Sequence, residues 1–428
     1  MYNGIAIEDF GKPAVLLVHP GFVTDAHSAA SSRGLPGLRI LPLNVPNEAT
    51  VTADIDAGTA QAMQGIFENL TRPLTAEEKA PKPSNAKSPR LVFKGTYEEV
   101  NRHFYENGWT DGLPIVPPTE QAVKEMMTGT DLAPDYVVAK VIPRLGKATV
   151  EKIAINAVMA GALPTHLPVL VAAVQALMDP RSRFDTFEVS TGSWAPFFAI
   201  NGPIRHDINL NYSSGSFSPG DLANSAIGRA VGLIVRNIGG ARKGIEDMGV
   251  IGNPAKYSLV IGENEEESPW KPLQVERGFA KEDDTVTLFF PNSYAMTVPM
   301  ETSAQGIAQS LANMGPWNMS CLIVIPSHAK ILAAEGWTKE KLKEFVLKNA
   351  PSRLPARAAG ADILSQPPAA DSDGLMILVA GGPGAWMGML RSVGGIQNGF
   401  ITRKIELPKN WDKLVAKYKD VVPKYVSY

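Results

Sequence analysis

The sequence of 428 residues lacks most of the features that assign a chain to a functional class. It has one cysteine, Cys321, so no internal disulfide can form. Cys321 opens the apolar run CLIVI, which predicts a buried strand and a structural thiol in a reducing compartment. No run approaches the ~18 apolar residues of a membrane-spanning helix, and the first residues show no export signal. We therefore expect a cytoplasmic protein without a membrane partner.

The sequence also lacks a marked excess of positive or negative charge. The 41 basic and 43 acidic residues are mixed along the chain and give a net charge of −2. A phosphate backbone would need a basic surface, so nucleic acid is not an expected partner. The sequence contains no HExxH, CxxC or GxSxG motif, and its six histidines have no metal-ligand spacing. Zinc hydrolysis and Ser-His-Asp chemistry are therefore not expected, no metal site is predicted, and the cofactor stays unknown.

The sequence does contain enough apolar residues, 44%, for two or three globular cores. The N-terminal residues 1–75 alternate between strand and helix patterns, at 14–18, 25–33, 38–45 and 54–70. This order predicts a small βαβα unit with two parallel strands covered on both faces. Two strands do not make a stable sheet, so the missing strands must come from the C-terminal part or from another chain.

A proline-rich and lysine-rich stretch at residues 76–90 reads as a linker. It precedes a larger α/β part at 91–428, which we expect to be catalytic. There, Thr96 and Glu99 form a capping box that begins a helix. The following segment GWTDGLPIVPPT cannot be helical because of its prolines, so Asp111 lies in a stiff loop. Asp111 either points at a ligand as a catalytic group or closes an Asx-turn.

Small polar residues surround glycines between Asn201 and Arg229. The string INLNYSSGSFSPGDLANSAIGR leads into a helix from about Asp221, whose free amides suit a carboxylate or phosphate. The alternative is a polar loop that satisfies its own hydrogen bonds. Arg229 and Arg236 share a helix face, where they either clamp an anion or are solvated. The predicted substrate-binding residues of this region are Asn201, Ser213, Ser214, Ser216, Asn224 and Arg229.

Acidic residues crowd the end of the strand predicted at 258–261, in the string GENEEESPW. Strand ends are where open α/β sheets bind ligands, and crowding in a partly buried site would raise a carboxyl pKa. Glu263 and Glu265 are therefore candidate acids or bases, although such a run is often a solvated loop. His328, just after the strand at 321–325, is a further candidate. Gly381 and Gly382 place backbone amides at another strand end, without a Walker or dinucleotide motif.

Two similar four-residue strings suggest an internal repeat. NGWT at Asn107 and EGWT at Glu335 each close a predicted helix. They suggest that the larger part is built from two related halves that would meet in a shared cleft.

Two resemblances add to these patterns. The string ASSRGLPGLRILPLNVPNEAT resembles the C-terminal half of small UGSC-type thiol or selenol proteins, which are similar to the selenoprotein subunit of glycine reductase. The half that carries their reactive U/C-G-x-C motif has no counterpart here. The larger part resembles uncharacterised bacterial proteins with GWTDGLPIVPPT, NGPI, ENEE.SPW and VAGGPG, which are often associated with UGSC-type proteins. The second resemblance implies one site but no particular reaction.

The patterns together predict an enzyme that acts on a small polar or anionic metabolite. It would form or cleave a carbon–heteroatom bond by acid/base chemistry, as a lyase or hydratase does, and is expected to be a homo-oligomer. The alternative is a non-catalytic substrate-binding subunit that completes its sheet with a UGSC-type redox partner. A self-sufficient enzyme should complete the N-terminal sheet through its own C-terminal part or a second copy, whereas a subunit should leave that edge open.

Overall fold

The computed structural model describes residues 2–45, 52–76, 89–315, 319–350, 374–393 and 399–424. Most of the linker predicted at 76–90 falls outside these residues. In the part that the structure describes, no helix is long and apolar enough to cross a bilayer. The α/β class predicted from the sequence is confirmed: helices cover mixed sheets that contain parallel and antiparallel strand pairs.

The N-terminal unit is the predicted βαβα unit, preceded by one further helix. Its elements are α1 (Tyr2–Asp9), β1 (Val15–Val18), α2 (Val23–Ser32), β2 (Arg39–Pro42) and α3 (Thr52–Thr71). The two strands pair in parallel, and no described residue of the larger part adds a third strand. Its small core includes Ile5, Ala30 and Leu38. Contrary to expectation, β1 is not buried on both faces, and Leu17 is 42% exposed.

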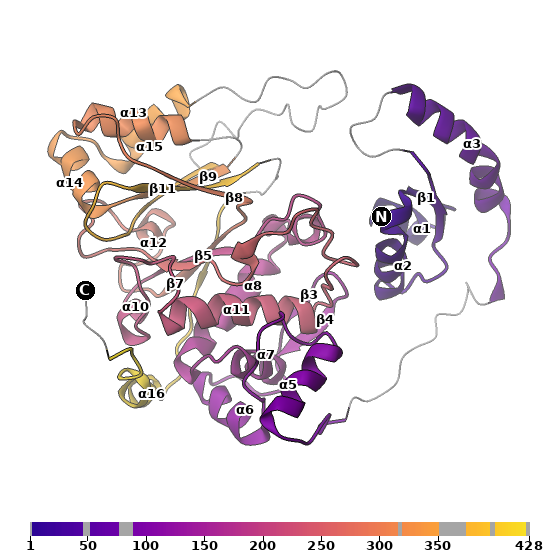
Figure 1. Cartoon of the computed structure of the whole chain (residues 1–428), viewed down its shortest axis with the longest axis horizontal. Helices are drawn as coiled ribbons and strands as arrows, with labels where there is room; N and C mark the ends of the chain where they lie inside the picture. Colours follow the sequence, from indigo (N-terminus) through magenta and orange to yellow (C-terminus); the bar gives the residue numbers. More distant parts are fainter. Residues whose placement is uncertain are drawn as a thin grey trace.

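Figure 1 shows this unit, in indigo, beside the larger part rather than within its sheets. Among the described residues, hydrogen bonds at Ser28 of α2 join the two parts. The Ser28 hydroxyl donates to Glu246 over 2.6 Å and accepts from Arg144 over 3.0 Å. Both partners belong to the larger part, so the N-terminal unit is held there through a loop and a hairpin turn.

The first sheet of the larger part has four strands in the order β12–β7–β5–β6. These are β5 (Phe197–Asn201), β6 (Val260–Gly262), β7 (Thr285–Phe289) and β12 (Ile401–Lys404). β5 and β6 are parallel, whereas β7 runs antiparallel to both β5 and β12. One face of this sheet packs against α7 (Val150–Met159), α8 (Leu167–Leu177) and α11 (Leu222–Asn237).

The second sheet repeats this arrangement in the order β8–β11–β9–β10. Its strands are β8 (Ser293–Thr297), β9 (Met319–Val324), β10 (Leu375–Val379) and β11 (Met387–Ser392). Again the last two strands of the order are parallel and the others antiparallel. Its outer face packs against α13 (Ala304–Met314), α14 (Pro326–Ala334) and α15 (Lys339–Asn349).

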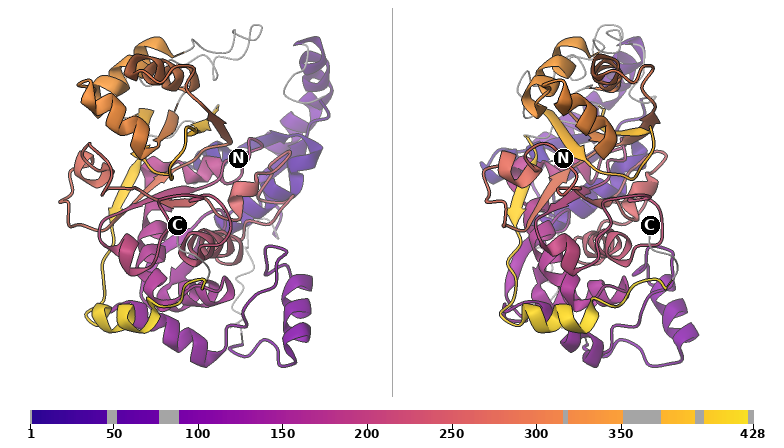
Figure 2. Two further views of the ribbon diagram at one scale, coloured as in Figure 1. Left: turned by 60° about the vertical axis from the view of Figure 1, so that its left-hand side comes forward. Right: turned by 90° about the vertical axis from the view of Figure 1, so that its left-hand side faces the viewer.

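The two sheets pack face to face, which gives four layers in the order helix, sheet, sheet, helix. Side chains alternate along a strand, so Phe198 of β5 faces the helices while Phe197 faces the other sheet. Phe197 shares one buried cluster with Cys321 of β9 and Leu378 of β10. Figures 1 and 2 show the orange helices α13–α15 and the magenta helices α7, α8 and α11 on opposite sides of the strands.

The remaining elements pack on the helical side of the first sheet, except the short helix Leu273–Glu276, whose Leu273 belongs to the cluster between the two sheets. They are α5 (Tyr97–Glu106), α6 (Glu120–Met126), the hairpin β3 (Val137–Val141) and β4 (Gly146–Thr149), the short helices α9 (Phe184–Phe187), α10 (Ile204–Asp207) and α12 (Leu273–Glu276), and α16 (Trp411–Tyr418). The capping box of Thr96 and Glu99 is confirmed, and the Thr119 side chain caps α6 by accepting from the Ala122 amide. These hydrogen bonds satisfy amides that the first helical turn leaves free.

The strings NGWT and EGWT end their helices with the same backbone geometry. Gly108 and Gly336 have φ of 69° and 79°. The next amide, of Trp109 or Trp337, donates back five residues to Phe104 or Leu332. However, α5 precedes both sheets, whereas α14 lies between β9 and β10. The two strings therefore do not occupy equivalent positions in the fold. The shared strand order is an independent observation, and a duplicated origin stays a prediction.

Candidate functional site

The carboxyl ends of the parallel strands of both sheets meet in the middle of the molecule. The Asn264 amide, just after β6, donates to the Val379 carbonyl of β10 over 2.7 Å. The Gly381 amide, just after β10, donates to the Tyr212 carbonyl over 2.9 Å. Gly381 has a φ of 96°, which favours glycine at this turn. The acid-rich, serine-rich and glycine-rich segments chosen from the sequence are therefore brought together.

The serine-rich loop packs closely on the glycine pair. A Cβ at Gly382 would overlap the Ser214 hydroxyl oxygen, so only glycine permits this approach. Asn211 organises the loop: its side-chain oxygen accepts from the Ser213 amide and its side-chain amide donates to the Ser214 carbonyl. Ser216 is buried. Loop and glycine turn thus form one packed unit.

Asn224 holds this loop to α11 and β6. It accepts from the Asn211 amide and donates to the carbonyls of Asn211, Ser216 and Val260, at 2.8 to 3.4 Å. These bonds match the alternative in which the polar loop satisfies its own hydrogen bonds. A role for Asn224 in substrate orientation would therefore act through the loop.

Glu263 is completely buried at the end of β6, with 0% of the residue exposed. Its carboxylate accepts from the Asn201 side chain over 2.7 Å, from the Leu273 amide over 2.7 Å and from Lys339 over 3.1 Å. Lys339 is 2% exposed and also contacts Glu276 over 2.6 Å. Burial disfavours the charged lysine, but the two carboxylates outweigh burial and raise the pKa of Lys339.

Glu265 lies beside Glu263 and meets the end of β5. It accepts hydrogen bonds from the Gly202 amide over 2.8 Å and from the side chains of Asn201 and Gln274, and it forms an ion pair with Arg205 over 3.1 Å. Arg205 is 2% exposed. Glu263 and Glu265 are therefore held inward by an ordered set of donors, which excludes the solvated-loop alternative for these two residues.

Glu266 and Glu267 lie further out. Burial opposes ionisation of Glu266, but hydrogen bonds from Arg205 and His206 outweigh burial and lower its pKa to about 2. Glu267 pairs with Lys330 over 3.2 Å, and both side chains are about half exposed. The acidic run therefore divides into an inward pair and an outward pair.

Asp284 is a further candidate residue, which the sequence pattern did not indicate. It is 8% exposed, accepts from the Ile204 amide over 2.8 Å and lies against Gly202. Burial raises its pKa to about 6, and the nearby carboxylates of Asp207 and Glu265 add to the effect. A carboxyl group that titrates near neutral pH suits proton transfer. Thr285 pairs with Asn201 because β7 is antiparallel to β5, which the sequence pattern did not reveal.

Two buried amide oxygens in the cluster have no hydrogen-bond partner among the described residues. They are the side-chain oxygens of Asn201 and Gln274, whose amide nitrogens bind Glu263 or Glu265. The Thr285 hydroxyl is also unpartnered among the described residues. An unmet buried acceptor costs roughly 1–3 kcal/mol, so each group could receive a donor from a bound molecule or water.

His328 lies in the first turn of α14, close to the end of β9, and is 5% exposed. Burial lowers its pKa, and its Nδ1 has no partner among the described residues. No hydrogen bond or ion pair joins it to Glu263 or Glu265 in the part of the chain that the structure describes. Its predicted acid/base role stays a prediction.

Asp111 and Arg229 are engaged with each other. Arg229 forms a bidentate pair with Asp111, at 2.8 and 3.0 Å, and also donates to the Pro114 carbonyl. Asp111 also accepts from the Leu113 amide over 3.2 Å, as the Asx-turn alternative predicts. Arg236 donates to the Gly108 carbonyl. The anion that Arg229 clamps is thus a side chain of this protein, and the contact fixes the loop on α11.

Cys321 lies inside β9 with no exposed surface, and burial raises the pKa of its thiol. Among the described residues, no group of three or more histidine, cysteine, aspartate or glutamate side chains is positioned for a metal ion.

Comparison of the chain with protein-family models, curated proteins and solved structures gave no significant match.

Proposed function

We propose that this protein is an enzyme that acts on a small polar or anionic metabolite. The reaction would form or cleave a carbon–heteroatom bond by acid/base chemistry at the cluster of Asn201, Glu263, Glu265 and Asp284. One observation carries the proposal: buried charged groups and unmet acceptors gather where the parallel strands of both sheets end. Charged groups are costly to bury, and such clusters concentrate at functional sites.

Each residue of the cluster has a role in this proposal. Asp284 transfers a proton, because its pKa of about 6 allows both protonation states near neutral pH. Glu265 is the second acid/base, and Glu263 is held by Lys339 as the fixed charge beside it. The free oxygens of Asn201 and Gln274 accept hydrogen bonds from the substrate. Ser214, Gly381 and Gly382 border the same strand ends.

The experiment starts with native mass spectrometry of the protein purified from its own host. A retained metabolite would be identified, and its conversion followed with the wild type, Glu265→Gln, Asp284→Asn and the exposed control Glu267→Gln. Loss of an acid/base group is expected to lower turnover roughly 100-fold or more. Glu267→Gln should retain activity. Unchanged turnover in both Glu265→Gln and Asp284→Asn would refute the proposal.

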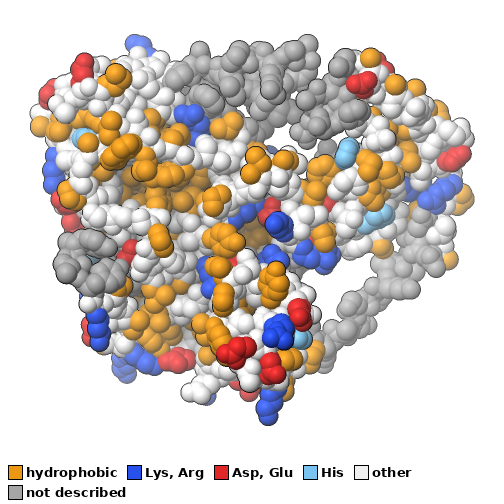
Figure 3. All heavy atoms as spheres, in the orientation of Figure 1, with side chains coloured by type: hydrophobic (Ala, Val, Ile, Leu, Met, Phe, Trp, Pro, Cys, Tyr) orange, Lys and Arg blue, Asp and Glu red, His pale blue; other side chains and the backbone are white. Residues whose placement is uncertain are grey.

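A second candidate function rests on the N-terminal sheet. The described residues leave it with two strands and open edges. Figure 3 shows hydrophobic side chains on this unit, and Phe10 and Phe67 are 83% and 57% exposed. We therefore keep as an alternative a substrate-binding subunit whose partner, of UGSC type, completes the sheet and supplies the thiol or selenol. Such strand addition is a known mode of recognition.

The same mass measurement separates the two functions. A co-purifying thiol or selenol protein would favour the subunit, and a homo-oligomer would favour the self-sufficient enzyme. Leu17→Lys places a charge on β1 and should release a partner that adds a strand there. Val116→Lys changes an exposed residue of the larger part, 48% exposed, and should leave the complex intact.

A further inference from the structure

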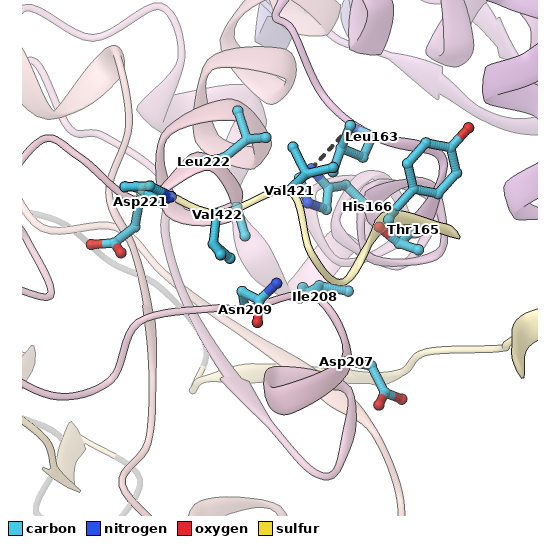
Figure 4. Close-up of a pocket in the computed structure, with 13 residues that line it drawn as sticks. Leu163, Thr165, His166, Asp207, Ile208, Asn209, Asp221, Leu222, Val421 and Val422 are labelled. Carbon is cyan, nitrogen blue, oxygen red and sulfur yellow. Dashed lines mark hydrogen bonds between the residues drawn. The ribbon is translucent and has the colours of Figure 1, made fainter. Parts of the chain in front are cut away.

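A cavity of about 270 Å³ lies at the N-terminal end of α11, on residues that the proposed function does not use. Its walls come from the 3₁₀ turn Pro164–His166, from the end of α10, from the first residues of α11 and from the chain after α16. Figure 4 shows His166 and Thr165 on one side and Leu222 and Asn209 on the other. At about 30 Å³ per water, the volume suits a small molecule rather than a nucleotide.

His166 supplies the most specific polar group of this cavity. It is 1% exposed, and its Nδ1 accepts from the Leu163 amide over 3.2 Å. Burial lowers its pKa to about 3, so the ring is neutral at physiological pH. With Nδ1 accepting, the proton is on Nε2, which has no hydrogen-bond partner among the described residues. His166 therefore offers a buried, uncharged donor to whatever occupies the cavity.

The start of α11 adds further donors. Asp221 is the N-cap residue, but its side chain does not cap the helix and instead accepts from Asn211 over 2.8 Å. The amides of Leu222 and Ala223 therefore have no hydrogen-bond acceptor among the described residues. Free amides at the start of a helix of 16 residues attract a hydrogen-bond acceptor.

The charges around the cavity exclude one class of ligand. Its described lining contains two carboxylates, Asp207 and Asp221, and no lysine or arginine. Both acids have other partners: the Trp411 indole donates to Asp207 over 2.8 Å and Asn211 donates to Asp221. In Figure 4 their carboxylates turn away from His166. An anion would meet two negative charges and no neutralising cation, so an uncharged acceptor fits better.

The remaining wall is aliphatic, formed by residues such as Leu163, Ile208, Leu222, Val421 and Val422. We propose that this cavity binds a small uncharged molecule with a branched aliphatic body and a carbonyl oxygen. The oxygen accepts from Nε2 of His166 and from the first amides of α11, while the aliphatic body lies against the valines after α16. This site is independent of the strand-end cluster and does not rest on the proposed enzymatic function.

The test compares two probes of the same shape, isovaleramide and isovalerate, by isothermal titration or ligand-observed NMR. The neutral amide should bind with a millimolar Kd, which is within reach of seven non-hydrogen atoms. The carboxylate should bind at least about tenfold more weakly because of Asp207 and Asp221. Equal or tighter binding of isovalerate, or no binding of isovaleramide, would overturn the proposal.

Three variants locate the binding. Val422→Trp fills the cavity from a residue that is 45% exposed, so the fold should tolerate it while amide binding is lost. Val92→Trp is the matched control, because Val92 is also 45% exposed but lies outside the cavity, and it should bind as the wild type does. His166→Asn keeps an acceptor for the Leu163 amide but lacks the Nε2 donor, and should weaken binding about tenfold. Unchanged amide binding by Val422→Trp would also overturn the proposal.

Discussion

Lys339 on α15 pairs with Glu263 at the end of β6, with 3.1 Å between Nζ and Oε1. α15 covers the second sheet and β6 belongs to the first, so this ion pair joins the two sheet layers. The side chains are 2% and 0% exposed. An ion pair so fully removed from water is sensitive to the loss of either partner, because the remaining charge stays buried.

Replacing Lys339 with methionine is therefore expected to destabilise the protein strongly. The change leaves Glu263 buried without its cation, which typically costs about 3–5 kcal/mol. Urea unfolding followed by circular dichroism measures the loss. Lys330→Met removes the cation of the half-exposed pair with Glu267 and should cost about 1 kcal/mol or less. Equal losses of stability in the two variants would show that the buried ion pair of Lys339 matters no more to stability than the half-exposed pair of Lys330.

Gly382→Ala should disrupt the contact between the glycine turn and the serine-rich loop. Its Cβ would overlap the Ser214 hydroxyl, so one segment must shift, at a cost of about 1–3 kcal/mol. Adding Ser214→Gly removes the obstructing side chain and should restore part of the stability, as measured by thermal unfolding. Failure of the double variant to recover would mean that Ser214 is not the obstacle.

Most helices and several strands of this fold could be predicted because their signals are local. Thr96 and Thr119 begin helices through their own side chains, and the apolar runs at β6 and β9 predicted strands. The antiparallel strands β8, β11 and β12 were not predicted. β8, with the sequence SYAMT, is mostly exposed at the edge of its sheet and has no apolar run.

The candidate site was predictable only in part, for a geometric reason. Glu263 and Gly381 follow parallel strands, and such ends gather at one edge of a sheet, so residue type and position indicated them. Asp284 precedes its strand and comes to the site only because β7 runs antiparallel to β5. That order depends on long-range packing. Asp111 and Arg229 are 118 residues apart, and nothing in either local pattern indicates their pairing.

The Asp111 and Arg229 pair is expected to show a measurable coupling energy. Their side chains are each 18% exposed and the pair is bidentate, so a double-mutant cycle with Asp111→Ala and Arg229→Ala should give about 1–2 kcal/mol in urea unfolding. The exposed pair of Arg183 and Asp185, 3.8 Å apart, is the control and should give a coupling near zero. A coupling energy of zero for Asp111 and Arg229 would mean that the pair does not stabilise the fold, and Asp111 could then serve its predicted catalytic role.

Glu188 should make stability depend on pH. It is 5% exposed and its Oε2 has no hydrogen-bond partner among the described residues. Burial, with Asp247, Glu246 and Asp25 nearby, raises its pKa from the ordinary 4.5 to about 8, against the opposing effect of Lys256. The folded state therefore binds a proton between these values that the unfolded state releases.

The sign of the effect follows from this difference in protons. A raised carboxyl pKa in the folded state means that stability is greatest below about pH 4.5 and falls as the pH rises through 8. The loss between pH 5 and pH 8 should be roughly 3 kcal/mol from this group. Glu188→Gln stays neutral, so its stability should change less over the same range and exceed that of the wild type at pH 8. The exposed control Glu344→Gln should keep the wild-type pH profile in urea unfolding. If Glu188→Gln also follows the wild-type profile, Glu188 is ionised in the folded protein. Lys256 and the arginines that bind Glu246 must then balance the negative charge that Glu188 carries.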